Sequence, residues 1–259
     1  MTNPSKEPTP SEPKGTLRGP FEPWDFEALS GPRSRSPEYN EKRLEARRRL
    51  LALGKDAAKK VKSIGVSLEA RSSLHNPHAF NGNRVSRLWT YLVRAKTEKA
   101  RLRKVLGSDL AKDLDRAYKN IYLCLAIEHD ALEVSLRIHA DAWYDGQNLL
   151  RRVKAEGLDG WLSVLNTLDG FRLGLDDWKG EWRCGKLTRE SLEEYLRHYT
   201  PGEHQLLVER RWPVPTDPEQ RKAILAGEVS ETMLAEVLRL VPLYEYCAWS
   251  RTSDFLFES

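Results

Sequence analysis

Cysteine is scarce in this sequence. The 259 residues contain three cysteines, Cys124, Cys184 and Cys247, and no two of them have C-x-x-C spacing. An odd number without that spacing argues against a disulfide framework or a zinc ribbon and favours a reducing, cytoplasmic setting. Long apolar runs are also absent, because no window approaches the roughly 18 apolar residues of a membrane span. Residues 1–40 lack the apolar core of a signal peptide. We therefore expect a soluble protein with no membrane partner.

The common nucleotide-binding and hydrolase motifs are missing too. The sequence contains no G-x-G-x-x-G, G-x-x-x-x-G-K-[ST], G-x-S-x-G or H-E-x-x-H pattern. His75 and His78 flank an Asn-Pro pair, with no cysteine or carboxylate close in sequence. Asp176, Asp177 and Glu181 have a lysine among them and lack the spacing of a calcium loop. The sequence therefore predicts neither a cofactor nor a metal site.

Charge is abundant and unevenly distributed. Residues 1–104 hold 23 Lys and Arg against 11 Asp and Glu, a net charge of +12. Residues 105–259 hold 19 against 27, a net charge of −8. This polarity predicts a basic surface for an anionic partner, or two halves that neutralise each other within one domain. A chain of this length can bury a full core.

Period-two patterning between residues 121 and 139 is the clearest structural signal. Residues 121–127 are apolar on both alternating faces, which is typical of a strand covered on both sides. Residues 128–130 are polar and tolerate a tight turn. Apolar residues then alternate with a polar series that consists of Glu133, Ser135, Arg137 and His139. We predict a β-hairpin at the centre of the molecule.

The remaining patterns alternate between strands and helices. Strands are predicted at 66–74, 85–93, 171–175 and 204–212, and helices at 39–64, 96–116, 147–155, 158–168 and 188–198. Residues 218–249 read as helix, in two pieces around Glu228, with Pro242 interrupting the end. Asp145 and Thr188 are predicted N-caps. Hairpins separated by helices predict an α+β fold with an antiparallel or mixed sheet flanked by helices.

The two ends of the chain differ from its middle. Residues 1–37 are rich in Pro, Ser, Gly and Glu and predict a disordered arm, followed by a single compact α+β domain at 38–259. Within the arm, residues 21–29 carry three aromatics and a leucine, so this piece is expected to dock on the folded body or on a partner. Residues 240–257 are strongly apolar and either close the core or form a partner surface.

Polar strand faces supply the candidate catalytic residues. Glu133, Arg137 and His139 share one face of the hairpin, and Asp141 continues their register. Arginines of such a group could bind an anion, and the histidine with a carboxylate could transfer protons. The competing interpretation is a solvated sheet face with cross-strand ion pairs.

Basic residues of the N-terminal half supply the candidate binding residues. Two of the candidates, Glu69 and Arg71, belong to the polar face of the strand at 66–74. The others could contact phosphates, and they are Arg84, Arg87, Arg101, Arg103 and Lys104. Trp89 or Tyr91 could stack a base, and the competing interpretation is that both are core residues and the basic side chains are merely solvated.

Two functions follow from these candidates. The first is a non-catalytic binding module that recognises a protein or a nucleic acid through its basic N-terminal half. The alternative is an enzyme that acts on a phosphate- or carboxylate-bearing substrate through the Glu133, Arg137 and His139 cluster. The oligomeric state is not determined by these patterns.

Overall fold

The structure, a computed structural model, describes residues 21–72, 84–176, 180, 182–226 and 228–257. Within these residues, seven strands form one sheet in which every pairing is antiparallel, in the order β1-β2-β3-β4-β7-β5-β6. The strands are β1 (Leu68–Ser72), β2 (Arg87–Arg94), β3 (Tyr122–Glu128), β4 (Ala131–Ile138), β5 (Arg172–Leu175), β6 (Trp182–Arg183) and β7 (Leu206–Pro213). The predicted α+β class is confirmed.

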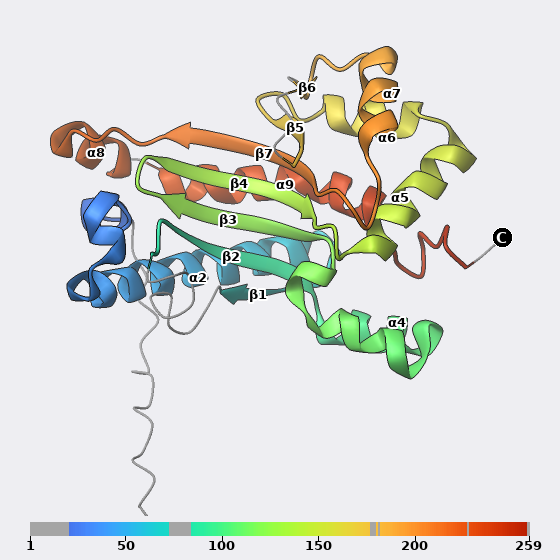
Figure 1. Ribbon diagram of the computed structural model, residues 1–259, viewed down its shortest axis with the longest axis horizontal. Helices are drawn as coiled ribbons and strands as arrows, with labels where there is room; N and C mark the ends of the chain where they lie inside the picture. Colours follow the sequence, from blue (N-terminus) through green and yellow to red (C-terminus); the bar gives the residue numbers. More distant parts are fainter. Residues whose placement is uncertain (1–20, 73–83, 177–179, 181, 227, 258–259) are drawn as a thin grey trace, which may run out of the picture.

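Helices connect and flank these strands. The longer ones are α2 (Asn40–Ser63), α4 (Lys96–Leu110), α5 (Trp143–Glu156), α7 (Arg189–His198) and α9 (Val229–Cys247). The shorter ones are α1 (Pro23–Glu27), η1 (Gly31–Arg35), η2 (Pro37–Tyr39), η3 (Ala111–Asp115), η4 (Ala117–Lys119), α6 (Asp159–Asn166) and α8 (Pro218–Leu225). In Figure 1, α2 and α9 lie side by side behind the strands and cover one face of the sheet.

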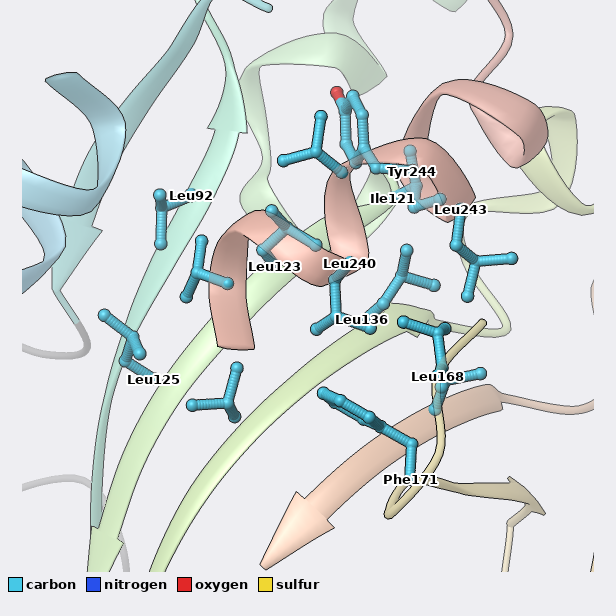
Figure 2. Close-up of a cluster of buried hydrophobic side chains, with 14 of the residues drawn as sticks. Leu92, Ile121, Leu123, Leu125, Leu136, Leu168, Phe171, Leu240, Leu243 and Tyr244 are labelled. Atoms are coloured by element: carbon cyan, nitrogen blue, oxygen red, sulfur yellow. The ribbon is translucent and has the colours of Figure 1, made fainter. Parts of the chain in front are cut away.

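The predicted central hairpin is confirmed and forms the middle of the sheet. Leu123 of β3 lies opposite Leu136 of β4, and the same face of β2 contributes Leu92. These side chains meet Leu240 and other residues of α9 in the buried cluster drawn in Figure 2. The apolar phase of the alternation therefore lies beneath the helices, which is what burial of one sheet face requires.

Close packing of α2 on the sheet depends on Gly54. A Cβ at this position would lie 2.4 Å from Cγ2 of Thr90, a fully buried residue of β2. Overpacking of a core typically costs about 1–3 kcal/mol. We expect Gly54→Ala to lower the free energy of unfolding by about that amount, measured by urea denaturation.

The double variant Gly54→Ala/Thr90→Ser separates this clash from other effects. Serine at position 90 removes the methyl group that the new Cβ would meet, so the double variant should lose less stability than the sum of the two single variants. Alanine has a higher helix propensity than glycine by about 1 kcal/mol. A stabilised single variant would therefore mean that propensity outweighs the clash.

The N-terminal segment corrects a boundary of the sequence-based prediction. Residues 21–37, assigned to a disordered arm, form α1, η1 and part of η2, and Phe26 and Leu29 are buried in the main core. Arg43 of α2 is fully buried and donates hydrogen bonds to the carbonyl oxygens of Arg33 (2.7 Å) and Ser36 (2.8 Å). The expectation that residues 21–29 dock on the body is confirmed. Residues 1–20 lie outside the described residues.

Three local predictions have clear outcomes in the structure. Thr188 caps α7 as predicted, since its hydroxyl accepts the amide hydrogen of Ser191. Asp145 is not an N-cap, because it lies inside α5 and pairs with buried Arg94. Pro242 does not interrupt α9. The residues on both sides of the proline are buried, and the helix continues to Cys247. At both of these positions, tertiary contacts outweigh the local signal.

The C-terminal segment closes the core, in line with one of its two predicted roles. Leu243, Cys247 and Trp249 are buried, and Trp249 packs edge-on against Tyr144 of α5 with ring centroids 5.8 Å apart. Phe257 remains half exposed.

Candidate functional site

The second face of the sheet, which α2 and α9 do not cover, carries the polar phase of the strands. Glu133 of β4 lies at its centre and is almost fully buried. Its Oε1 accepts hydrogen bonds from Arg87 of β2 (2.8 Å) and Arg137 of β4 (2.6 Å), and its Oε2 accepts one from Arg211 of β7 (3.1 Å). The hydroxyl of Ser135 donates another, at 2.7 Å. Three strands thus place three guanidinium groups around one carboxylate.

The charge state of this group follows from its contacts. Burial alone would raise the pKa of Glu133, but the neighbouring charges of Arg87 and Arg137 outweigh burial and lower the pKa to about 2. Glu128 bridges Arg87 and Arg211 at 2.9 and 2.8 Å. Glu133 is therefore ionised near neutral pH and has no proton to donate as a general acid.

The four candidate catalytic residues do not converge. Glu133 and Arg137 are in contact, whereas His139 follows the end of β4 and packs edge-on against Tyr118, with ring centroids 5.6 Å apart. His139 Nδ1 accepts the backbone N–H of Asp141 at 3.1 Å. His139 lies six positions after Glu133 along an extended chain, a distance of roughly 20 Å. The proposed Glu133–Arg137–His139 cluster is thus split into two groups.

The candidate binding residues occupy two further places. Glu69 and Arg71 form an ion pair on β1 (2.6 Å), and Lys99 of α4 approaches Glu69 at 3.7 Å. Arg101 pairs with Glu98 and is largely exposed. The other exposed candidates are Arg84, ahead of β2, and Arg103 and Lys104 on α4, which projects from one end of the sheet in Figure 1.

Two arginines of the basic helix at 40–63, Arg43 and Arg49, make contacts inside the protein. Arg43 holds the N-terminal segment, and Arg49 pairs with buried Asp25 at 2.7 Å. Among the lysines of this helix, Lys60 forms an ion pair with Glu231 of α9 at 3.5 Å. Part of the positive charge of the N-terminal half is therefore neutralised by ion pairs, some of them within that half.

Aromatic side chains form a hollow beside the Glu133 group. Trp89 and Tyr91 of β2 stand edge to face with centroids 6.2 Å apart, and Tyr91 meets Tyr122 of β3 at 4.9 Å. Together with Cys124, Arg87 and Arg137 they line a shallow hollow of about 240 Å³. Trp89 and Tyr91 keep part of their surface exposed, so neither is a full core residue.

Two residues of this hollow were not among the predicted site residues. Tyr122 and Cys124 belong to the stretch whose two faces are both apolar, and only one of those faces lies beneath the helices. The signal that could have identified them is the polar partner strand, since Tyr122 lies opposite Arg137 and Cys124 opposite Ser135. Burial raises the pKa of the Cys124 thiol to about 11, so it is a neutral thiol near pH 7.

The described part of the chain shows neither a metal-ligand cluster nor a membrane span. Among the described residues, no three His, Cys, Asp or Glu side chains are grouped so that they could hold a metal ion. His75, His78, Asp177 and Glu181 lie outside those residues. No described helix has both the length and the apolar character needed to cross a bilayer.

Comparison with protein-family models and with curated proteins gives no match to this sequence. The evidence for function therefore comes from the geometry and chemistry of the sheet face.

Proposed function

We propose that this protein binds single-stranded nucleic acid on the uncovered face of its sheet. The observation that carries the proposal is the hollow formed by Trp89, Tyr91 and Tyr122, with Arg87 and Arg137 at its sides. Base stacking on aromatic side chains is largely independent of sequence, because every base has a π-face. Antiparallel sheets with helices on one side and exposed aromatics on the other are a recurrent platform for unpaired bases.

The arginines of the hollow are suited to contact phosphate. Arg137 uses Nε and Nη2 for Ser135 and Glu133, while its Nη1 forms no hydrogen bond with any other described residue. The charged centre consists of Arg87, Arg137 and Arg211 around Glu128 and Glu133, which leaves a formal excess of one positive charge. A guanidinium held in place by carboxylates loses little further entropy when it binds an anion.

The shape of the hollow favours an unpaired strand over a duplex. A duplex conceals the faces of its bases, and reading its grooves requires a protruding helix or ribbon. A shallow aromatic hollow on a sheet can instead receive a base that is already unstacked. Base stacking on the aromatic side chains is therefore the main contact in this proposal. The basic residues of α4 add a long-range electrostatic attraction between the protein and the negatively charged strand.

Fluorescence anisotropy with a labelled 12-nucleotide single strand tests the proposal. We expect Trp89→Ala/Tyr91→Ala to weaken binding by about 1–3 kcal/mol for each base that no longer stacks, or roughly 5- to 150-fold per base. The wild type should prefer the single strand to the matching duplex, and its affinity should fall with salt.

A tryptophan that does not line the hollow supplies the matched control. Trp24 of α1 is 46% exposed and lies on the N-terminal segment, so Trp24→Ala should leave affinity unchanged. Equal binding by wild type and the Trp89→Ala/Tyr91→Ala variant, or no salt-dependent binding at all, would remove the proposal.

The free thiols support the reducing setting that the sequence predicts. Cys124, Cys184 and Cys247 are all buried and unbridged. We propose a cytoplasmic location on this basis, since disulfides are rare there.

A further inference from the structure

The three arginines around Glu133 differ in how their guanidinium groups are used. Arg87 donates from Nη1 to Glu128 (2.9 Å) and from Nη2 to Glu133 (2.8 Å). Arg211 likewise uses both of its Nη atoms for these two carboxylates. Arg137 uses Nη2 for Glu133 (2.6 Å), whereas its Nη1 forms no hydrogen bond with any other described residue. Arg137 therefore differs from its two neighbours in having hydrogen-bond donors to spare.

The contacts of Arg137 determine which of its N–H groups remain. Nε donates to the hydroxyl of Ser135 at 3.1 Å, and that hydroxyl lies 2.7 Å from the Glu133 oxygen that Nη2 binds. Two acceptors this close together are met by N–H groups on one edge of the planar guanidinium, the edge shared by Nε and Nη2. The adjacent edge keeps one N–H of Nη1 and one of Nη2. These two are parallel and suit a pair of neighbouring acceptors.

This second edge of the guanidinium belongs to the aromatic hollow. Arg137 lines the hollow together with Tyr91 and Tyr122, and Tyr122 is its direct partner in the β3–β4 register. Glu133 and Ser135, on the other edge, are almost fully buried, while the Arg137 side chain keeps 15% of its surface exposed. A base stacked on the tyrosine rings would lie with its own edge against the two remaining N–H groups.

The location of these donors favours the edge of a base as their ligand. A phosphate also offers paired acceptors, but Glu133 already neutralises much of the charge that Arg137 would present to an anion. Guanine carries two adjacent acceptors, O6 and N7, to which arginine donates as a bidentate pair, whereas adenine places an N6 donor beside its N7. Cytosine has two neighbouring acceptors as well, O2 and N3, but only one ring to stack on the tyrosines.

We infer that Arg137 selects guanine at the aromatic hollow, so that the protein prefers single strands that contain this base. The inference rests on the proposed function and adds a base preference to it. The guanine ring stacks on Tyr91 or Tyr122, and its O6 and N7 accept hydrogen bonds from Nη1 and Nη2 of Arg137. Because this preference comes from directed hydrogen bonds, it is separable from the salt-dependent attraction between the protein and any strand.

Strands that differ in one central base test the inference on the wild type alone. In a 12-nucleotide strand whose other bases are thymine, a central guanine should bind roughly 5- to 150-fold more tightly than adenine, the range for one bidentate pair. It should also bind more tightly than cytosine. Hypoxanthine, which keeps O6 and N7, should match guanine. The base 7-deazaguanine lacks the N7 acceptor and should lose most of the preference, as measured by fluorescence anisotropy.

The variant Arg137→Lys keeps the charge and removes the parallel pair of donors. It should bind the guanine and adenine strands within about twofold of each other and retain the salt dependence of the wild type. Arg172→Lys is the matched control, because Arg172 lies on the same sheet face and pairs with Glu209 of the neighbouring strand, but does not line the hollow. This control should keep the guanine preference. Thermal melting verifies that both variants fold.

The outcomes distinguish the base preference from the proposed function. Equal affinity for guanine and adenine, equal affinity for guanine and 7-deazaguanine, or a preference for cytosine would overturn guanine selection while single-strand binding itself stands. A guanine preference that survives in Arg137→Lys would remove the role of this residue. A wild type that binds none of the strands would remove the proposed function, and guanine selection with it.

Discussion

Asp145→Asn is expected to lower the free energy of unfolding by about 3–5 kcal/mol, the usual cost of removing one partner of a buried ion pair. Asp145 is fully buried and accepts two hydrogen bonds from the guanidinium of Arg94, which is itself almost fully buried. It also accepts the backbone N–H of Ile121 (2.7 Å) and of Trp249 (2.8 Å). Asparagine would leave Arg94 without its counter-charge and would direct an NH₂ group at one of these donors. The melting temperature should fall by roughly 6–20 °C.

Two comparisons distinguish the contribution of the ion pair to stability from other effects of the substitution. Asp141→Asn changes a half-exposed carboxylate that only approaches His139 at 3.7 Å, so its effect should stay below about 1 kcal/mol. The double variant Arg94→Met/Asp145→Leu removes both charges and should lose less stability than the sum of its single variants. Urea denaturation followed by circular dichroism measures all of them. Additive losses would show that the pair itself contributes nothing.

Glu133→Gln is expected to destabilise the protein by about 3 kcal/mol near neutral pH, because it leaves three arginines around an uncharged side chain. The loss should depend on pH. Folding lowers the pKa of Glu133 from 4.5 to about 2, so its charge stabilises the fold fully above about pH 4.5. That contribution disappears as the pH falls through about 2. The difference between wild type and Glu133→Gln should therefore shrink as the pH falls across this range.

An exposed glutamate provides the control for the pH series. Glu231 pairs with Lys60 at 3.5 Å, and its side chain is 66% exposed. Glu231→Gln should change stability by less than about 1 kcal/mol at every pH. Urea midpoints for the three proteins between neutral pH and pH 3 provide the measurement. A loss for Glu133→Gln that does not vary with pH would mean that packing, and not charge, holds the group together.

Both of these charged groups are anchored on β2. The Arg94–Asp145 pair joins β2 to α5 and to the C-terminal segment through the carbonyl oxygen of Trp249. The Glu133 group joins β2, β4 and β7 on the uncovered face. The same strand also carries Trp89 and Tyr91. We therefore expect the aromatic hollow to be held on a rigid strand, which favours binding with little reorganisation.

Part of the candidate site was predictable from sequence. The polar phase of β4 and the aromatic character of β2 were both evident from period-two patterning, because side-chain direction alternates strictly along a strand. The burial of Glu133 was not evident. Alternation predicts which face of the sheet a side chain lies on. It does not predict that Arg211, 78 residues further along the chain, lies on the neighbouring strand and covers Glu133. The separation of His139 from Glu133 shows a second limit, because residues that share a phase can still lie far apart along a strand.

By itself, the sequence determined the local elements of this protein: the 121–139 hairpin, the helix at 40–63 and the Thr188 cap. These follow from backbone geometry and from contacts between residues near each other in the chain. Only the tertiary structure decided that β7 lies between β4 and β5, that Asp145 neutralises Arg94, and that Pro242 stays within a helix. The physical reason is that burial and charge pairing between residues far apart in the chain outweigh the smaller local preferences.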